Sequence, residues 1–475
     1  MSASPPTSSP HEPEGQALRA LPDADLVSRL RAGFESGRTR PAAWRQEQLG
    51  RLAALLRENA DALAEALQAD LRKPDVEAWA TDIGFVLGEV DLVRKKLRSW
   101  MKPERIRTPL KLQPGSSWIV RDPLGVVLII APWNYPIQLA LAPLAAAIAA
   151  GNCAVVKPSE LTPHVSAALA RLVPRYLDPE CVAVVEGGVP ETTALLGERW
   201  DHIFYTGNGR VGRIVMEAAA RHLTPVTLEL GGKSPCIVDS DVDLEIAARR
   251  ITWGKFLNAG QTCVAPDYLL VHESREAELI GLLERNLRAF YGDDPQRSPD
   301  LARIVSDAHL DRLAKLLESG ETVVGGRVDR ADRYVAPTIL RSVSPESPAM
   351  QEEIFGPILP VLTVPDVDAA IAFVNARPKP LALYVFTRRK PVEDAVLSRT
   401  SAGGVCVNAV LWHLGNPSLP FGGVGESGMG AYHGRHGFEA MSHHKGVVKK
   451  STKADPKIGY PPYTRLKKAL IKRFI

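Results

Sequence analysis

The feature that most constrains the fold is an alternation of short apolar segments with helical segments between residues 125 and 205. Residues 125–131 are apolar at every position, which favours a strand buried on both faces of a sheet. Residues 153–157, 182–185 and 202–205 are also strand-like, and a helical stretch precedes each of them. This order predicts right-handed βαβ units in a doubly wound parallel sheet, an architecture typical of nucleotide-binding domains.

The remaining sequence divides into further units. Residues 24–100 place Leu, Ala and Val at spacings of three and four, which predicts consecutive amphipathic helices. A second alternation of strand-like and helical segments, over residues 235–407, predicts a second α/β domain. We therefore expect an α/β fold with a cofactor domain from residues 23–105 and 124–228, followed by a second domain from residues 229–408.

The two ends of the chain differ from the rest. Residues 1–22 are rich in Ser, Pro and Glu and are expected to form a disordered tail, not a signal peptide. Residues 451–475 form a tail that ends in a short basic helix with Leu466, Leu470 and Phe474 on one face. Such a helix could contact anionic lipid at a membrane surface, or it could pack on its own protein or on a dimer partner, and we favour packing.

The composition excludes several classes of protein. Lys and Arg number 58 against 54 Asp and Glu, and a net charge of +4 does not fit a nucleic-acid binder of this length. The five cysteines are scattered, without a metal-binding cluster, so we expect no metal and a reducing, cytoplasmic compartment. Pro132, Pro136 and Pro143 interrupt the most apolar stretch, which argues against an integral membrane segment.

A G-x-G-x-x-G turn runs from Gly207 to Gly212, between a strand-like segment and a helical pattern that starts at Arg213. Such a turn lets backbone amides approach the phosphates of a dinucleotide at a helix N-terminus. The alternative is a glycine-rich turn that holds no ligand. In a Rossmann domain, the distance from this turn would assign Glu229 to the cofactor ribose.

Cys263 and Glu229 both have the chemistry of a covalent enzyme. Cys263 follows a small polar turn, where a thiolate would be accessible, although a free cysteine is more often a small buried hydrophobe. Glu229 stands in an apolar segment just before two glycines. A carboxyl group so placed is paired, neutral or catalytic, and a raised pKa would suit a general base.

Six motifs resemble those of the aldehyde dehydrogenase superfamily and occur in its order. They are Pro132-Trp-Asn-Tyr-Pro136, Lys157-Pro-Ser-Glu160, Glu229-Leu-Gly-Gly232, Gly260-Gln-Thr-Cys263, Glu353-Ile-Phe-Gly-Pro357 and Pro420-Phe-Gly-Gly423. The sequence between these motifs resembles that of the class 3 branch, and the resemblance covers roughly residues 31–444.

The resemblance implies oxidation of an aldehyde, aliphatic or aromatic and hydrophobic, to the carboxylic acid. Cys263 would attack the carbonyl carbon, and the Asn134 amide with the Cys263 backbone N–H would stabilise the oxyanion. Glu229 would activate the water that hydrolyses the thioester, so its role is a general base and not the ribose ligand. Alternatives are a coenzyme A-acylating enzyme, against which Glu229 argues, and a non-catalytic protein that reuses the fold.

The resemblance also implies the cofactor residues. Lys157 and Glu160 would bind the adenosine ribose, and Glu353 and Phe355 would lie near the nicotinamide ribose. Thr206, Gly207 and Gly212 would be close to the nicotinamide or pyrophosphate. We expect NAD, with NADP possible, because a carboxylate at position 160 accepts a hydrogen bond from the 2′-OH and repels a 2′-phosphate.

Finally, the resemblance implies a small β extension for oligomerisation, formed by residues 106–123 and 409–450, and a homodimer. The strands of this extension are expected within residues 111–122 and after Met441, since edge strands need covering. The chain departs from the family pattern at Trp412 and residues 414–417, in a loop expected to shape the substrate mouth.

Overall fold

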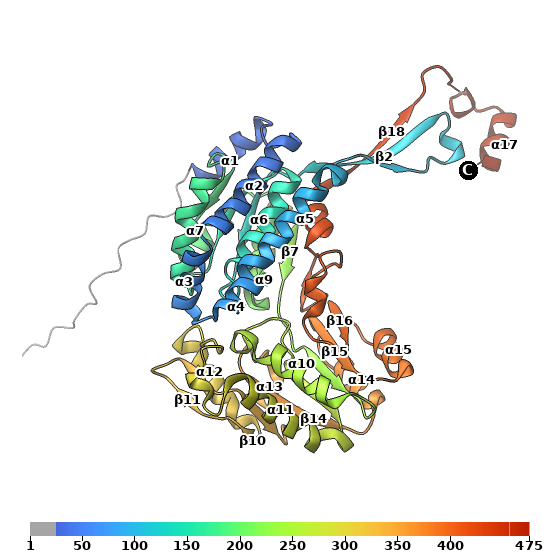
Figure 1. Ribbon diagram of the computed structural model, residues 1–475. Helices are drawn as coiled ribbons and strands as arrows, with labels where there is room; N and C mark the ends of the chain where they lie inside the picture. Colours follow the sequence, from blue (N-terminus) through green and yellow to red (C-terminus); the bar gives the residue numbers. More distant parts are fainter. Residues whose placement is uncertain (1–24, 456, 475) are drawn as a thin grey trace, which may run out of the picture.

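The computed structural model describes residues 25–455 and 457–474, and the expected disordered tail of residues 1–22 lies outside these residues. The chain forms two large sheets with their helices, one above the other in Figure 1, and a long β arm that leaves the body. A small hairpin pairs β11 (Val328–Asp329) with β12 (Tyr334–Val335).

The first sheet has the strand order β17-β7-β6-β3-β4-β5. Its strands are β3 (Val126–Ile130), β4 (Cys153–Lys157), β5 (Val182–Val184), β6 (His202–Thr206), β7 (Val226–Glu229) and β17 (Gly428–Met429). All neighbours are parallel except β17, which is antiparallel to β7. The predicted doubly wound parallel sheet is confirmed.

The helices that belong to this sheet come from the N-terminal half of the chain. They are α1 (Leu26–Glu35), α2 (Ala42–Glu58), α3 (Ala60–Leu71), α4 (Asp75–Glu77), the π-helix η1 (Ala78–Ile83), α5 (Gly84–Trp100), α6 (Gln138–Ala150), α7 (Pro163–Tyr176), α8 (Val189–Gly197) and α9 (Gly209–Ala220). Every residue of β3, β4 and α6 is buried, because α6 lies against both strands and α2 and α5 cover α6. The most apolar stretch of the sequence is therefore the core of this unit.

The second sheet has the order β10-β13-β14-β9-β8-β15-β16, parallel except for β10. Its strands are β8 (Pro235–Val238), β9 (Tyr268–His272), β10 (Glu321–Val324), β13 (Thr338–Arg341), β14 (Ile358–Val364), β15 (Ala382–Phe386) and β16 (Gly404–Val407). Its helices are α10 (Leu244–Phe256), α11 (Glu276–Tyr291), α12 (Asp307–Leu316), α13 (Pro348–Gln351), α14 (Val367–Asn375) and α15 (Lys390–Arg399).

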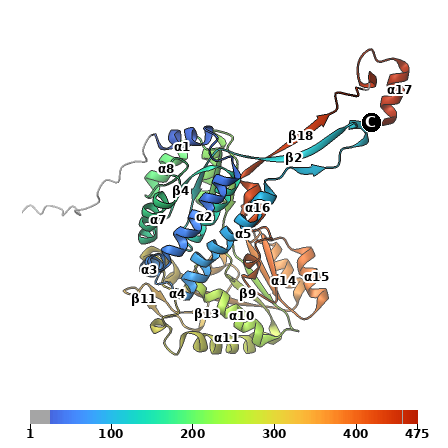
Figure 2. The same ribbon diagram turned by 45° about the horizontal axis from the view of Figure 1, so that its top comes forward.

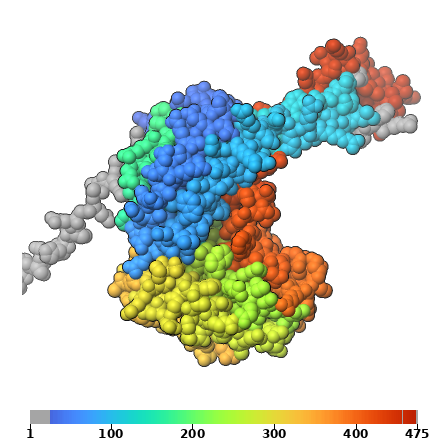
Figure 3. Space-filling model, in the orientation of Figure 1, coloured from blue at the N-terminus to red at the C-terminus, as the bar shows by residue number. Residues whose placement is uncertain are grey.

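The arm is a three-stranded antiparallel sheet of β1 (Glu104–Ile106), β2 (Gly115–Pro123) and β18 (Ser442–Lys450). The two segments expected to form the extension thus pair with each other along nine residues. Helix α16 (Gly434–Ala440) leads into β18, and η8 (Lys457–Gly459) and α17 (Arg465–Phe474) follow at its far end. Figures 2 and 3 show the arm extending well away from the rest of the molecule.

Local capping sets the start of two helices, and one of them, α9, begins before Arg213, where the sequence pattern places its start. Helix α8 begins at Val189 because the Glu191 carboxylate accepts a hydrogen bond from the Gly188 N–H at 2.7 Å. Helix α9 begins at Gly209, inside the glycine-rich turn, because the Asn208 side chain accepts from the N–H of Val211.

Among the described residues, no helix combines the length and apolar character needed to cross a membrane. The same residues hold no group of three or more His, Cys, Asp or Glu side chains placed to bind a metal ion.

Candidate active site

Polar side chains gather at the carboxyl ends of the parallel strands of the first sheet. Asn134 follows β3, Lys157 ends β4, Thr206 ends β6, and Glu229 ends β7. Thr206 and Glu229 are register partners on adjacent strands. Because the strand order reverses between β3 and β6, this edge is the place where open α/β sheets bind ligands.

Cys263 reaches this edge from the second unit, on an irregular turn after α10. Within η3 (Leu257–Gly260), Asn258 and Ala259 have φ values of 51° and 52°. These values lie in the left-handed region, which residues other than Gly rarely adopt. Buried Gln261 fixes the turn, since its side-chain amide donates to the carbonyls of Asn258 and Arg303 at 3.0 and 2.9 Å. A strained turn held in this way presents Cys263 in one position.

Asn134 is held against this turn by several hydrogen bonds. Its side-chain amide donates to the Gln261 backbone carbonyl at 3.1 Å, and the backbone carbonyl of Asn134 accepts from the side chains of Asn258 and Lys73 at 2.9 and 3.1 Å. An amide nitrogen carries two hydrogens, so one remains for a ligand. The structure therefore brings Asn134 and the cysteine turn together.

Lys73 and Asp82 support Asn134 and were missed by the sequence analysis. Their fully buried side chains form an ion pair of 2.7 Å, and Asp82 also accepts from the backbone N–H groups of Ile137 and Gln138, both at 3.1 Å. Nothing in the spacing of these residues marks them, because the contact depends on packing η1 against the start of α6.

Glu229 is buried, with 3% of its surface exposed, and neither carboxylate oxygen has a hydrogen-bond partner among the described residues. Loss of hydration raises the pKa of Glu229 well above its ordinary value. An unpartnered buried carboxyl group costs free energy, so its retention points to a role with a ligand.

Cys263 is partly accessible, yet the pKa of its thiol lies well above the ordinary value. Burial is the main cause, and the negative charges of Glu353 and Glu229 add to it. The same interactions place both carboxylates within electrostatic reach of the sulfur. The thiol is therefore protonated at neutral pH and needs a base to become a nucleophile.

Lys157 and Glu160 lie together at the end of β4, with 3.0 Å between the ammonium nitrogen and the carboxylate. Lys157 is buried, whereas the Glu160 side chain is half exposed. The hydroxyl of Thr206, on the strand next to β3, is buried without a partner in the described part of the chain. An orphaned hydroxyl and a charged, accessible pair at the ends of β6 and β4, on either side of β3, fit a dinucleotide that lies across this edge.

The two outer glycines of the G-x-G-x-x-G turn have packing reasons of their own. A side chain at Gly207 would overlap the Tyr205 hydroxyl, and one at Gly212 would meet Leu230 at 3.0 Å. The alternative of a turn shaped by packing alone stays open for this motif, and its contact with a cofactor stays a prediction.

Glu353 and Phe355 lie in the segment between α13 and β14. The charge of Glu353 acts on the Cys263 thiol. The Glu353 carboxylate is so close to the Gly231 backbone that a side chain at 231 would overlap it. Burial, followed by the negative charge of Asp267, raises the pKa of Glu353 to about 8. Phe355 packs edge-to-face on Trp133 at 5.3 Å and has a φ of 50°.

The loop that departs from the family pattern forms η7 (Trp412–Gly415). Trp412 is 67% exposed, and its ring lies 6.4 Å from that of Trp253 on α10, the helix that leads to the cysteine turn. Two partly exposed indoles form an apolar surface suited to a hydrophobic ligand.

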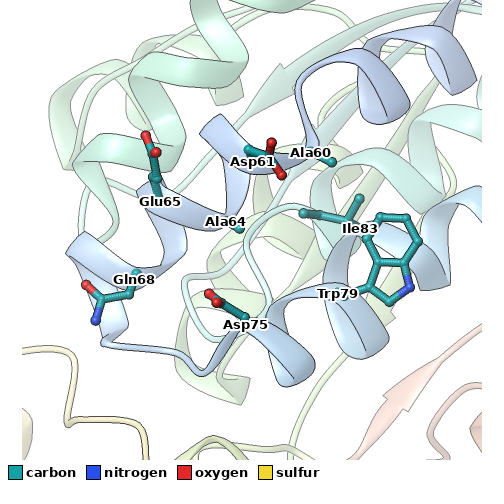
Figure 4. A pocket seen from close by; sticks show the side chains of 8 residues that line it. All are labelled: Ala60, Asp61, Ala64, Glu65, Gln68, Asp75, Trp79 and Ile83. Atoms are coloured by element: carbon teal, nitrogen blue, oxygen red, sulfur yellow. The ribbon is translucent and has the colours of Figure 1, made fainter. Parts of the chain in front are cut away.

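A separate surface pocket of about 690 Å³ lies between α3 and the α4–η1 segment (Figure 4). Carboxylates of Asp61, Glu65 and Asp75 and the indole of Trp79 line it. None of the predicted site residues contributes to its lining.

Comparisons with known proteins agree with this architecture. A model of the Aldehyde dehydrogenase family matches residues 24–447. The chain belongs to the aldehyde dehydrogenase family and is an aldehyde dehydrogenase.

Individual relatives narrow the assignment to the class 3 branch. The chain is 50% identical to aldehyde dehydrogenase family 3 member B1 of Bos taurus, over 93% of this chain and 95% of that protein. It is 48% identical to the dimeric NADP-preferring aldehyde dehydrogenase of Mus musculus, over 92% of this chain and 97% of that protein.

Solved structures give the same result. A substrate-bound state of Staphylococcus aureus AldH is 47% identical, with a TM-score of 0.93, over 95% of this chain and 98% of that one. An indole-3-acetaldehyde dehydrogenase in complex with NAD+ is 29% identical, with a TM-score of 0.82, over 90% and 88% of the two chains.

Proposed function

We propose that this aldehyde dehydrogenase oxidises a hydrophobic aliphatic or aromatic aldehyde to the carboxylate with NAD(P), through a thioester on Cys263. The observation that carries the proposal is the buried, unpartnered carboxyl group of Glu229 within electrostatic reach of the Cys263 thiol. A nucleophile and a base in one site are the minimum for covalent catalysis followed by hydrolysis.

The first step is attack of the Cys263 sulfur on the aldehyde carbon. The raised thiol pKa requires that a base remove the proton, and Glu229 and Glu353 are the carboxylates that act on the sulfur. The tetrahedral adduct carries an oxyanion, which the free hydrogen of the Asn134 amide and the Cys263 backbone N–H stabilise. The buried Lys73–Asp82 pair keeps Asn134 in place for this purpose.

Lys157, Glu160 and Thr206 would hold the dinucleotide along the first sheet, and Glu353 and Phe355 would contact its nicotinamide half. When bound, NAD(P) supplies the acceptor for the hydride that leaves the substrate carbon. The carboxylate at position 160 favours NAD, with NADP also accepted.

Glu229 then acts on the thioester. It removes a proton from water, the oxygen attacks the acyl carbon, and the bond to the Cys263 sulfur breaks to release the carboxylate product. The presence of this base supports water, not coenzyme A, as the acyl acceptor.

The arm supports a homodimer, because β18 pairs on one side only and an exposed strand edge calls for a partner.

The five cysteines, all free, support a reducing compartment, which we take to be the cytoplasm. We retain the division into a cofactor domain of residues 23–105 and 124–228 and a catalytic domain of residues 229–408.

Glu229→Gln tests the assignment of the base. We expect a burst of NADH followed by turnover slowed roughly 10²- to 10⁴-fold, since loss of a general base costs about that much. Mass spectrometry should detect an acyl adduct on Cys263. A variant with normal kcat, weak NAD binding and no adduct would instead make Glu229 a cofactor ligand and overturn the proposal.

Cys263→Ser is the companion variant, because a serine hydroxyl is a much weaker nucleophile at neutral pH. We expect loss of dehydrogenase activity with NAD binding retained. Turnover close to that of the wild type would contradict covalent catalysis by Cys263.

A further inference from the structure

Behind Glu229, the described residues include a second group of buried polar side chains without hydrogen-bond partners. The Tyr432 hydroxyl and both ring nitrogens of His433 have none, although only 2% and 3% of these residues are exposed. A buried polar group without a hydrogen-bond partner destabilises the folded state. Several of them side by side are unexpected unless the site uses them.

The backbone at His433 is also strained. Its φ is 76°, in the left-handed region, although histidine has a full side chain. The ring is fixed in this conformation by stacking on Tyr432 at 3.9 Å and by edge contact with Phe85 at 5.3 Å. Strain held by the surrounding structure is a mark of function.

Tyr432 lies within electrostatic reach of two carboxylates, Glu229 on β7 and Glu89 on α5, and of the Cys263 thiol. His433 is close to Glu89, with 3.9 Å between its Nδ1 atom and a carboxylate oxygen. The other oxygen of Glu89 accepts from the Gly434 N–H. Stacking and the short distance to the carboxylate thus join Tyr432, His433 and Glu89 into one buried group, and the charge of Glu229 acts on its Tyr432 end.

We propose that Tyr432, His433 and Glu89 form a path by which Glu229 releases the proton that it takes from the hydrolytic water. The inference rests on the proposed function, in which Glu229 is the general base. A base buried without partners must lose its proton before the next turnover, and these three side chains act through Glu229 without touching the substrate.

The transfers balance. Water loses a proton to Glu229 as its oxygen bonds to the acyl carbon. Glu229 returns the proton by way of the Tyr432 hydroxyl, which gives up its own hydrogen as it gains one, and solvent water links the carriers where they do not touch. His433 passes one proton in the same way, and Glu89 delivers it to solvent.

The properties of the carriers suit this role. Burial lowers the pKa of His433 to about 3, so its ring is neutral between turnovers and does not retain the proton. Burial raises the pKa of Glu89 to about 6, which leaves this carboxylate ionised and able to accept a proton at neutral pH.

The test uses the full-length enzyme with His433→Phe, which keeps the stacked ring and removes both nitrogens, and Tyr432→Phe, which removes only the hydroxyl. We expect a normal NADH burst and a steady-state rate lowered by roughly tenfold or more, with acyl-Cys263 accumulating. The solvent deuterium isotope effect on the steady-state rate should increase. Glu89→Gln should act in the same direction.

Matched controls are His202→Gln and Tyr291→Phe, which alter a buried histidine and a buried tyrosine outside this group. A thermal melt confirms that each variant is folded, and His433→Gln replaces His433→Phe if the latter does not fold. Unchanged steady-state turnover would overturn the path, as would a raised aldehyde KM with loss of the burst, which would make His433 a substrate contact. If Glu229→Gln has a normal kcat, weak NAD binding and no acyl adduct, the proposed function fails; if it forms the adduct while the path variants turn over normally, only this inference fails.

Discussion

At the scale of single residues, the buried Lys73–Asp82 ion pair should contribute both to the stability of the fold and to the turnover rate. Lys73→Met leaves Asp82 charged and buried without its partner, which typically costs 3–5 kcal/mol of stability. It also removes a hydrogen bond to the Asn134 carbonyl. We expect urea unfolding to show this decrease in the free energy of unfolding, together with a lower kcat. Lys73→Met combined with Asp82→Leu should recover much of the stability, and equal stability of the single variant and wild type would contradict the role of the pair.

Glu160 governs the choice of cofactor in our proposal. Glu160→Gln removes the charge that repels a 2′-phosphate and keeps a hydrogen-bonding side chain. We expect the ratio of kcat/KM for NADP to that for NAD to rise about tenfold, a change of about 1.4 kcal/mol. Glu65→Gln, on the outer face of α3, is the control. A ratio that does not change would remove Glu160 from the ribose site.

Glu89 should make the free energy of unfolding decrease as the pH rises. Its pKa of about 6 in the folded protein exceeds the ordinary 4.5, so its contribution to stability is present at low pH and is lost as pH rises through 6. Glu89→Gln lacks this loss. The free energy of unfolding of the variant, relative to wild type, should therefore increase by about 1 kcal/mol between pH 5 and pH 8. A difference that is constant with pH would show that Glu89 has an ordinary pKa.

At the scale of elements, η7 brings Trp412 close to Trp253 on α10, the helix that leads to the cysteine turn. Trp412→Ala removes most of an apolar surface at the expected mouth of the site. We expect the KM for long-chain and aromatic aldehydes to rise about tenfold, while that for acetaldehyde changes less than twofold. Equal changes for all aldehydes would indicate a general disturbance of the site.

The strands and helices of the first unit could be predicted because their signals are local. The segments around β3 and β4 are apolar throughout, which marks strands buried on both faces. The short strand β17 could not be found, because two residues, Gly428 and Met429, carry no periodicity and pair with a distant strand. The early start of α9 depends on the cap at Asn208, which hydrophobic spacing does not report.

The site could be predicted only where its residues stand in recognisable motifs. Asn134 and the turn before Cys263 could be picked out because each lies in a family motif, and the structure places them in contact. Lys73 lies in the link between α3 and α4, Asp82 in the π-helix η1 and Glu89 in α5, and only the packing of these segments brings them to the site. Sequence patterns report periodicity and local chemistry, whereas such supporting contacts depend on three-dimensional packing.

At the scale of the whole molecule, the arm predicts how the protein assembles. Gly446→Pro removes a backbone N–H and distorts β18 where it pairs with Ile119 of β2. We expect a homodimer for the wild type and a monomer for the variant by light scattering, with an unchanged far-UV spectrum of the body. Ala454→Pro, beyond the end of β18, should leave the dimer intact. A dimeric Gly446→Pro protein would exclude the arm as the dimer contact.

The pairing of β17 with β7 also sets the order in which the protein can be completed on the ribosome. Glu229 ends β7, and its partner Gly428 is synthesised about 200 residues later, which takes roughly 10 to 40 s at 5–20 residues per second. Until then β7 is an open sheet edge in the nascent chain, and open edges pair with other chains. Although its other strands are made early, the first sheet is finished nearly last, so chains stalled before Gly428 should remain sensitive to protease near β7, and released chains should not.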